Sequence, residues 1–397
     1  MNLRRLSCKL EVACDKHHDN GLILNKIAFC GYHFFSVFKR ERMIMDKLRV
    51  AFIGTGRISD LHALAYLDDE RTDIAAVCDR SIELAEARGR RWDVPEDRIF
   101  SDYHEMLARP GIDLVEILLP HHLHYQATLD AVAAGKHVSV QKPMALTIPQ
   151  ADEMVAAAKA AGVTLKVYEN FIFYPPVQRA KALIDNGEIG DLLTIRIKSN
   201  SGISPSEWEV PSSALAWRLN PEECGGGPLV FDDGHHKFAL GWHFMGMAKE
   251  VHAWIGSTET GPGMYLDAPA IVSWKFPGNR YGSLEAVYSP ELVLDTRHYA
   301  QDDRIEITGS KGVIWVTRGH GKMMDLPPVV MYKDRQTRSF SDMPVGWEYS
   351  FINSTRQMID AWFAGEAPQL TGEDGREVLR FALAAQESAR LGHAVKL

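Results

Sequence analysis

The sequence predicts an α/β protein whose N-terminal part forms a doubly wound parallel sheet. Apolar runs typical of buried strands alternate with helical segments, the first run breaks into glycines, and turn residues end the later ones. Strands joined in this way by helices need right-handed crossovers, and such sheets bind ligands beyond the carboxyl ends of their strands. We therefore expect a ligand site along that edge.

Each element of this first domain has a local signal. Pro120 stops one strand, and Gly135 ends the helix that follows it. The last strand ends at Tyr168. The expected strands lie at 50–53, 73–78, 99–100, 112–119 and 137–140, and helices at 84–92 and 125–134.

The chain is long enough for two domains. Its 397 residues exceed one compact core, and 46% of them are apolar, which is enough to fill two cores. We expect a poorly ordered and dispensable extension over 1–46, a first domain over 47–168 and a second over 169–397. A translation start at Met43 or Met45 is an alternative interpretation of the extension. Charges interrupt the apolar part of the extension, so it predicts neither an export signal nor a membrane span.

Composition argues against several classes of partner. The formal net charge of -8 gives no electrostatic attraction for nucleic acid or an anionic membrane. The 5 cysteines show no C-x-x-C spacing and no secreted disulfide framework. We therefore expect a cytoplasmic protein that binds a small molecule.

The glycine turn predicts a dinucleotide site. Gly54 permits a tight turn, and Gly56 lets backbone N–H groups approach a pyrophosphate at the N-terminus of the next helix. Thr55, Arg57 and Ile58 complete this turn and are expected at the cofactor.

The second strand ends at Asp79, whose carboxylate is placed to accept hydrogen bonds from the adenosine ribose hydroxyls. This favours NAD as the cofactor. The neighbouring Arg80 suits a 2′-phosphate, so NADP is the alternative. Asp79 also fits a purely structural role as the N-cap of the next helix.

Lys142 follows the strand 137–140 and is the first candidate for chemistry. Together with Pro120 it maps to the carboxyl edge of the sheet, where its ammonium would reach the nicotinamide ribose and steady an alkoxide. A solvated lysine at a strand end fits equally well. The histidines at 121, 122 and 124 cannot all point at one ion, so no metal is expected there.

The second domain shows the period of an antiparallel sheet. Residues 271–276 and 282–287 alternate at period two, and 304–309 with 312–316 predict a hairpin. We expect helices to cover one face of this sheet, leaving the other for the active site or another subunit.

Several motifs together resemble the glucose-fructose oxidoreductase, inositol dehydrogenase and rhizopine-catabolism (Gfo/Idh/MocA) family. They are Ile53-Gly54-Thr55-Gly56, Leu119-Pro120-His121-His122-Leu123-His124, Gln141-Lys142-Pro143, Gly225-Gly226-Gly227-Pro228 and Asp232-Asp233-Gly234-His235-His236. The resemblance implies an N-terminal Rossmann domain and a C-terminal α+β domain with a large, mostly antiparallel open sheet. It also implies a homo-oligomer, either a dimer or a tetramer.

The same resemblance implies roles for individual residues. Lys142, Asp232 and His236 carry over as catalytic residues, and His124 and Gln141 join the cofactor-binding set. The acid of the family's glutamate-lysine-proline motif is Gln141 here, which removes a favourable neighbour of the Lys142 ammonium. The family's acid three residues past the histidine is Ala239.

Asp232 and His236 are four residues apart, which places both on one helical face if the helix begins near Asp232. We assign His236 as the base and Asp232 as the group that orients it. Asp233 with His235, or an N-cap, fits the local sequence almost as well. A metal site from these residues and His243 is the weaker alternative, and none is expected.

Substrate contacts are expected from Trp217 and Arg218, which supply an aromatic plane and a multidentate donor suited to a hydroxylated ring. Asn170 at the domain junction is a further candidate, although interdomain packing explains it equally well. Lys142, Asp232 and His236 complete the expected substrate set.

These residues predict an NAD-dependent oxidoreductase that oxidises or reduces a hydroxyl or carbonyl group of a sugar, cyclitol or glycoside. One alternative is an enzyme that retains NAD and cleaves glycosides through transient oxidation and elimination. An alternative of another class is a nucleotide-binding sensor without turnover.

Overall fold

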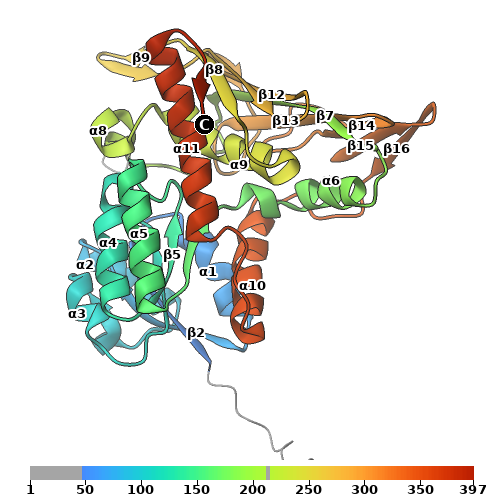
Figure 1. The fold of residues 1–397 in the computed structure, drawn as a ribbon. Helices are drawn as coiled ribbons and strands as arrows, with labels where there is room; N and C mark the ends of the chain where they lie inside the picture. The colour runs from blue at the N-terminus through green and yellow to red at the C-terminus, as the bar shows by residue number, and fades with distance from the viewer. Residues whose placement is uncertain (1–46, 212–214) are drawn as a thin grey trace, which may run out of the picture. The chain divides into compact units, whose positions relative to one another are not determined.

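A parallel sheet of 6 strands forms the first part of the fold, in the order β3-β2-β1-β4-β5-β6. The computed structural model describes residues 47–211 and 215–397, so the expectations for 1–46 lie outside the described residues. The strands are β1 (Leu48–Ile53), β2 (Thr72–Cys78), β3 (Ile99–Phe100), β4 (Leu114–Ile117), β5 (His137–Gln141) and β6 (Leu165–Tyr168). This order and the helices between the strands confirm the predicted doubly wound sheet (Figure 1).

Helices follow these strands as the crossovers require. They are α1 (Ser59–Asp68), α2 (Ile82–Arg91), α3 (Tyr103–Leu107), α4 (His121–Ala133) and α5 (Ile148–Ala161). The Ser81 side chain caps α2, and the Thr147 side chain caps α5. These caps fix where α2 and α5 begin, and therefore the course of the loops that lead to them from the ends of β2 and β5.

The second part of the fold is a large mixed sheet of 9 strands, in the order β16-β15-β14-β13-β7-β12-β11-β8-β17. Its pairs are antiparallel apart from β7 with β12, and the predicted hairpin is β13 with β14. The bounds are β7 (Leu192–Ile203), β8 (Glu250–Ile255), β11 (Ala270–Phe276), β12 (Arg280–Val293), β13 (Gln301–Gly309), β14 (Gly312–Val316), β15 (Val329–Lys333), β16 (Gln336–Phe340) and β17 (Val395–Lys396). A separate hairpin joins β9 (Thr258–Gly261) to β10 (Met264–Leu266).

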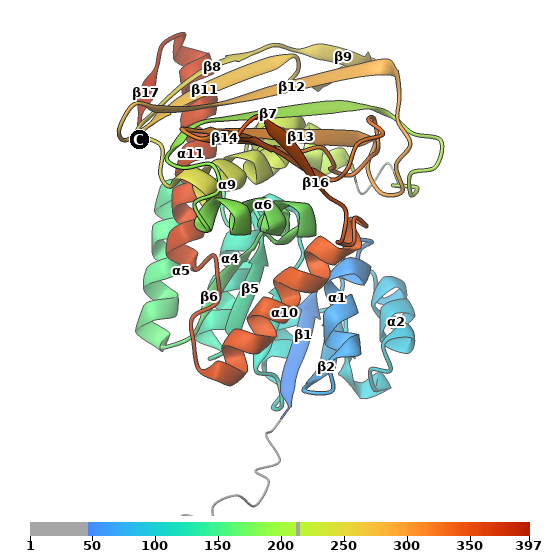
Figure 2. The same ribbon diagram turned by 90° about the vertical axis from the view of Figure 1, so that its right-hand side faces the viewer.

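Helices pack against one face of this sheet, as expected (Figure 2). They include α9 (Gly234–Met245) and α11 (Gly372–Leu391), which continues down to α5 and β6. Other α-helices in the described residues of this part are α6 (Pro175–Asp185), α8 (Pro221–Cys224) and α10 (Glu348–Ala364). Figure 2 shows the other face of the sheet free of helices.

Helix α10 lies far along the chain but packs on the first sheet, beside α1 (Figures 1 and 2). Its Met358 and Ile359 belong to the same buried apolar cluster as Leu48, Val50 and Phe52 of β1. A division of the chain at residue 168 therefore does not separate the cores, because the second segment helps to fill the core of the first.

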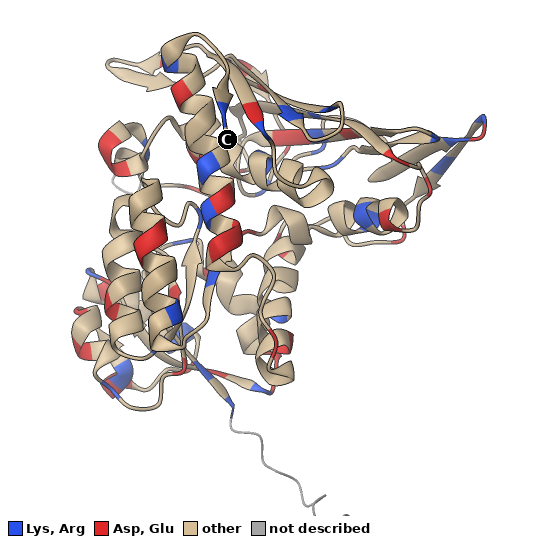
Figure 3. Cartoon of the chain, viewed as in Figure 1, with Lys and Arg blue, Asp and Glu red and all other residues tan. Residues whose placement is uncertain are grey.

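Positions of Lys and Arg alternate with those of Asp and Glu along the helices and the large sheet in the cartoon of Figure 3. Within residues 47–211 and 215–397, no helix combines the length and the apolar character needed to cross a bilayer.

Ile359→Ala tests the contribution of α10 to the first core. Ile359 is 0% exposed, so we expect the change to lower the free energy of unfolding by about 2–5 kcal/mol, and Ile359→Val by about 0.5–1.5 kcal/mol. Urea unfolding followed by circular dichroism measures both. Val345→Ala, at a 41% exposed position, is the control and should change stability by no more than about 0.5 kcal/mol. Equal losses for Ile359→Ala and Val345→Ala would contradict this packing.

Candidate active site

The turn after β1 is shaped to admit a dinucleotide. Gly54 has a φ of 94°, and a Cβ there would lie 2.4 Å from the carbonyl oxygen of Leu118, so only glycine fits. A Cβ on Gly56 would meet no heavy atom within 4 Å. This open space lies just before α1, which begins at Ser59. The predicted pyrophosphate cradle therefore fits a bound dinucleotide in both shape and backbone direction.

Asp79 holds the turn from the end of β2. Its Oδ2 accepts hydrogen bonds from Thr55 N (2.8 Å) and Thr55 Oγ1 (3.1 Å), and its Oδ1 accepts one from Ser81 N (3.0 Å). The N-cap of α2 is Ser81, so Asp79 does not fill that alternative role. Arg80 is exposed next to it.

Arg57 extends from the same turn to a segment of the second part. Its guanidinium lies 4.7 Å from the ring centroid of Trp208, which follows β7. The loop after β7 therefore contacts the edge of the nucleotide turn.

His124 differs from its predicted cofactor-binding role. Its side chain is fully buried, with Nδ1 2.8 Å from the carbonyl oxygen of Pro143 and Nε2 2.7 Å from that of Leu119. Burial lowers its pKa to about 3. Both ring nitrogens face backbone carbonyls, so His124 fixes the loops around Pro120 and Pro143 and has no nitrogen left for a cofactor.

The Lys142 and Asp232 side chains meet at the carboxyl edge of the sheet. Lys142 Nζ donates to Asp232 Oδ1 (2.6 Å) and to the carbonyl oxygen of Asp232 (2.7 Å), and both side chains are about nine-tenths buried. Arg218 Nε donates to Asp232 Oδ2 (3.0 Å), and His121 Nε2 lies 3.4 Å from Oδ1. Burial alone raises the pKa of Asp232, but Lys142, His121 and Arg218 outweigh it and hold that pKa well below its usual value.

His236 is held by a residue that the sequence reasoning missed. Its Nδ1 lies 2.7 Å and 2.8 Å from the two carboxylate oxygens of Glu169, at the end of β6. Phe171 stacks on the imidazole at 4.1 Å, and its N–H donates to Glu169 Oε1 (2.7 Å). The prediction that Asp232 orients His236 is therefore wrong, because residues 228–233 form a π-helical turn and α9 begins only at Gly234.

The electrostatic surroundings of His236 and Glu169 determine which atoms of the pair carry protons. Burial, together with the cations Lys142 and Lys237, lowers the pKa of His236 well below its usual value. Burial raises the pKa of Glu169 to about 7. A neutral imidazole donates its Nδ1–H to Glu169, so Nε2 carries a lone pair. Within the described residues, no hydrogen-bond partner occupies this Nε2.

The predicted substrate residues divide into two groups. The Arg218 guanidinium lies 4.3 Å from the ring centroid of Trp217, whose edge meets the ring of His121, so both residues join the cluster around Asp232. Asn170 is buried instead, and its Nδ2 donates to Ser350 Oγ of α10 (2.8 Å). Asn170 therefore packs the junction and does not line a substrate site.

The histidines of the alternative metal site do not converge. His235 is 1% exposed, and no protein group in the described ranges bonds either of its ring nitrogens. No set of three or more His, Cys, Asp or Glu side chains in 47–211 and 215–397 is arranged to hold a metal ion.

Two family profiles cover most of the chain. Residues 48–169 match the Gfo/Idh/MocA oxidoreductase family, NAD-binding Rossmann fold, and residues 181–397 match the C-terminal alpha/beta domain of the same family. The chain belongs to the Gfo/Idh/MocA oxidoreductase family.

Individual relatives agree with this assignment. Myo-inositol 2-dehydrogenase of Thermotoga maritima is 27% identical over 357 residues, which are 88% of this chain and 98% of that protein. The fold also resembles an oxidoreductase from Agrobacterium radiobacter solved with NAD⁺, L-tartaric acid and magnesium, with a TM-score of 0.76 at 22% identity, over 88% of this chain and 98% of that chain. A levoglucosan dehydrogenase solved with NADH and levoglucosan gives a TM-score of 0.73 at 23% identity, over 88% of this chain and 99% of that chain.

This Gfo/Idh/MocA chain departs from its family's motifs at two positions that the structure explains. Gln141 is turned into the first core, where its Nε2 lies 3.0 Å from His62 Nε2, so it does not open toward a cofactor. Asp232 supplies the carboxylate beside Lys142 that Gln141 lacks. Ala239 is fully buried in α9, so a small apolar residue suits that position.

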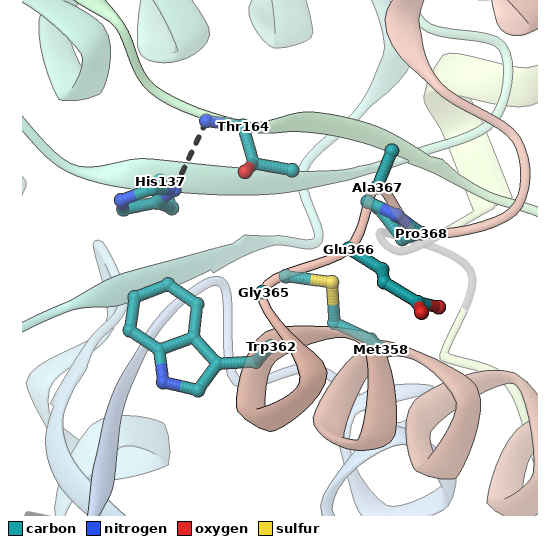
Figure 4. A pocket seen from close by; sticks show the side chains of 8 residues that line it. All are labelled: His137, Thr164, Met358, Trp362, Gly365, Glu366, Ala367 and Pro368. Atoms are coloured by element: carbon teal, nitrogen blue, oxygen red, sulfur yellow. Dashed lines mark hydrogen bonds between the residues drawn. The ribbon is translucent and has the colours of Figure 1, made fainter. Parts of the chain in front are cut away.

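A hollow of about 420 Å³ lies at the amino ends of β5 and β6, away from these residues (Figure 4). It is lined by His137, Thr164, Met358, Trp362, Gly365, Glu366, Ala367 and Pro368. None of the predicted site residues lines this hollow. The residues around Asp232 are therefore the better candidate for the active site.

Glu169→Gln tests the buried carboxyl. Its pKa is about 7 when folded against a usual 4.5, so its contribution to stability is complete below about pH 4.5 and is lost as the pH rises through 7. The variant should therefore gain stability relative to the wild type between these values, by on the order of 3 kcal/mol. Unfolding midpoints measured across this pH range test this.

The exposed Glu222→Gln is the matched control and should show no such trend. A constant difference between wild type and Glu169→Gln from pH 4 to 8 would contradict the raised pKa.

Proposed function

We propose that this family member is an NAD-dependent dehydrogenase that oxidises one hydroxyl group of a sugar, cyclitol or glycoside, or reduces the corresponding carbonyl. The observation that carries the proposal is the joint placement of a neutral histidine with an open Nε2, held by Glu169, and a lysine paired with a buried carboxylate. Both groups lie at the strand edge that also carries the nucleotide turn.

His236 is the proposed base. Its Nδ1–H is held by Glu169, so its Nε2 is the atom that accepts the hydroxyl proton. The carboxylate stabilises the imidazolium that forms, and the Phe171 ring keeps the imidazole plane fixed. NAD, when bound in the glycine cradle, supplies the hydride acceptor.

Lys142 is the proposed stabiliser of the substrate oxygen. Its ammonium is directed by Asp232, which also accepts from Arg218, so two cations present donors from one small region around a shared carboxylate. An oxygen that loses its proton to His236 gains negative charge, and a preorganised ammonium lowers the energy of that state. We propose Trp217 and Arg218 as contacts for the rest of the substrate, because the ring offers a flat apolar surface and the guanidinium has donors to spare.

Names of relatives support this substrate class. They include D-glucoside 3-dehydrogenase of Escherichia coli, at 30% identity over 54% of this chain and 59% of that protein, as well as myo-inositol 2-dehydrogenase.

We also propose a cytoplasmic homo-oligomer assembled through the helix-free face of the large sheet. Trp254, Ile271 and Tyr281 lie on this face, and each is about half exposed. Large apolar side chains on one open face are typical of subunit interfaces. The two described cysteines, Cys78 and Cys224, are free, which agrees with a reducing compartment.

The first experiment follows reduced-nicotinamide absorbance while the protein meets NAD or NADP with a panel of inositols, aldoses, sugar acids and glycosides. A substrate-dependent rise with NAD supports the proposal. Glycoside cleavage without net NADH, from protein that releases nicotinamide only on denaturation, would favour the elimination alternative. NAD binding without turnover across the panel would favour a sensor.

His236→Gln should lower kcat at least about a hundredfold, because it removes the base and leaves the cradle intact. Lys142→Met should lower kcat by a similar factor through loss of oxygen stabilisation. Steady-state kinetics measure kcat for each variant, and NAD titration followed by fluorescence measures separately whether the cofactor still binds. The control is His104→Gln, at a side chain 62% exposed on α3, which should keep full activity. Full activity in His236→Gln would contradict the assignment.

A further inference from the structure

A second glutamate–histidine pair is buried behind Lys142. His62 of α1 is 0% exposed and Glu116 of β4 is 1% exposed, and His62 Nδ1 lies 3.3 Å from Glu116 Oε2. Tyr66, one turn after His62, donates its hydroxyl hydrogen to Glu116 Oε1 (2.7 Å). On the other side of the imidazole, Gln141 Nε2 lies 3.0 Å from His62 Nε2.

One assignment of hydrogens satisfies the whole chain of contacts. Lys142 N donates to Gln141 Oε1 (2.8 Å), so the Gln141 amide nitrogen must face His62. His62 Nε2 then accepts from this amide, and the proton of the neutral ring resides on Nδ1 and is donated to Glu116. Burial lowers the pKa of His62, in agreement with a neutral ring.

A buried lysine accompanies Glu116 inside the core. Lys166 of β6 lies in the same register row as Glu116, with Ser139 of β5 between them. Its Nζ donates to the carbonyl oxygen (2.8 Å) and to Oγ (3.2 Å) of Ser354 in α10. Burial lowers the pKa of Lys166 to about 8, while Glu116 acts against that shift. The ring of Tyr168 lies against that of His62, tilted by 35° with the ring centroids 3.8 Å apart, and completes the groups around the imidazole.

We propose that His62 and Glu116 are positioning residues that fix the Gln141 amide and, through its bond to the Lys142 N–H, hold the backbone from which the lysine reaches Asp232. The carboxylate at 116 and the amide at 141 are a matched pair. Neither His62 nor Glu116 touches the reacting atoms. The kinetic part of the test below rests on the proposed dehydrogenase function, whereas the arrangement of hydrogen bonds does not.

This pairing predicts that carboxylates at 116 and 141 together are incompatible with a neutral His62. A carboxylate at 141 faces the lone pair of His62 Nε2, while Glu116 still requires a proton at Nδ1. His62 must then take a second proton between two carboxylates or lose one of its bonds. Moving the carboxylate, with an amide at 116 and a carboxylate at 141, restores a consistent network in which the neutral ring carries its proton on Nε2.

The experiment compares Gln141→Glu, Glu116→Gln and the double variant. We expect Gln141→Glu to lower kcat by about tenfold in the natural background and to change it little when residue 116 is glutamine. Glu116→Gln alone should have a small effect, because the single amide oxygen still accepts from His62 Nδ1 while the amide nitrogen donates to the Tyr66 hydroxyl oxygen. Gln126→Glu, which adds the same charge at an exposed position of α4, is the control.

Histidine-selective 15N NMR gives a readout that needs no substrate, with the His62 signals assigned through His62→Gln. The wild type should show a neutral ring protonated at Nδ1, Gln141→Glu a ring that is doubly protonated or has lost its fixed tautomer, and the double variant a ring protonated at Nε2. The same His62 tautomer in all variants, or equal kcat losses from Gln141→Glu in both backgrounds, would overturn the proposal. If no substrate is turned over, the dehydrogenase assignment fails while the NMR result still decides the network.

Discussion

The buried ion pair between Lys142 and Asp232 is the constraint on which the site depends. It joins the end of β5 to the turn before α9, two segments 90 residues apart, at a distance of 2.6 Å. Removing Asp232 would leave the Lys142 ammonium without its carboxylate at a position about nine-tenths buried, which is far more costly than losing an exposed pair. The carboxylate also receives Arg218, so the position of one aspartate determines where both cations lie.

Helix α10 provides a second connection between the parts of the fold. Its Ser350 accepts from Asn170, and its Ser354 accepts from Lys166, so polar groups at the end of β6 are satisfied by a helix some 180 residues further along. These bonds are buried, and an unsatisfied partner would cost the full desolvation of that group. The strand end that carries Glu169 is therefore held to α10 by the residues before and after it, Lys166 and Asn170.

Sequence reasoning located turns and strand ends where the required geometry is local. Gly54 and Asp79 are constrained by a turn and a strand end a few residues long, and the alternation of strands and helices fixes the edge on which they lie. It failed where burial or register decides. The π-helical turn at Pro228–Asp233 moves Asp232 away from the face predicted by its spacing from His236. His124 and Asn170 are polar residues at plausible positions, and only their tertiary partners show that they are structural.

Glu169 illustrates which signal was available. It directly follows β6, as Lys142 directly follows β5, and a carboxylate at the carboxyl edge of a parallel sheet is as much a candidate as a lysine there. The spacing of Asp232 and His236 predicts a complete pair, and such a pattern gives no reason to expect a carboxylate from β6 at the imidazole.

Two glutamate–histidine pairs thus lie on either side of the end of β6. Tyr168 packs its ring against His62, and the next residue, Glu169, holds His236. In both pairs a carboxylate fixes the proton on Nδ1 of a neutral ring, so Nε2 is the acceptor. The difference lies in what meets that acceptor. Gln141 occupies it in His62, which is 0% exposed, whereas the His236 side chain is 12% exposed and its Nε2 is the one left for a hydroxyl group. The same pairing of carboxylate and imidazole therefore occurs in the core and at the edge, and the partner of Nε2 together with the exposure of the ring distinguishes the two.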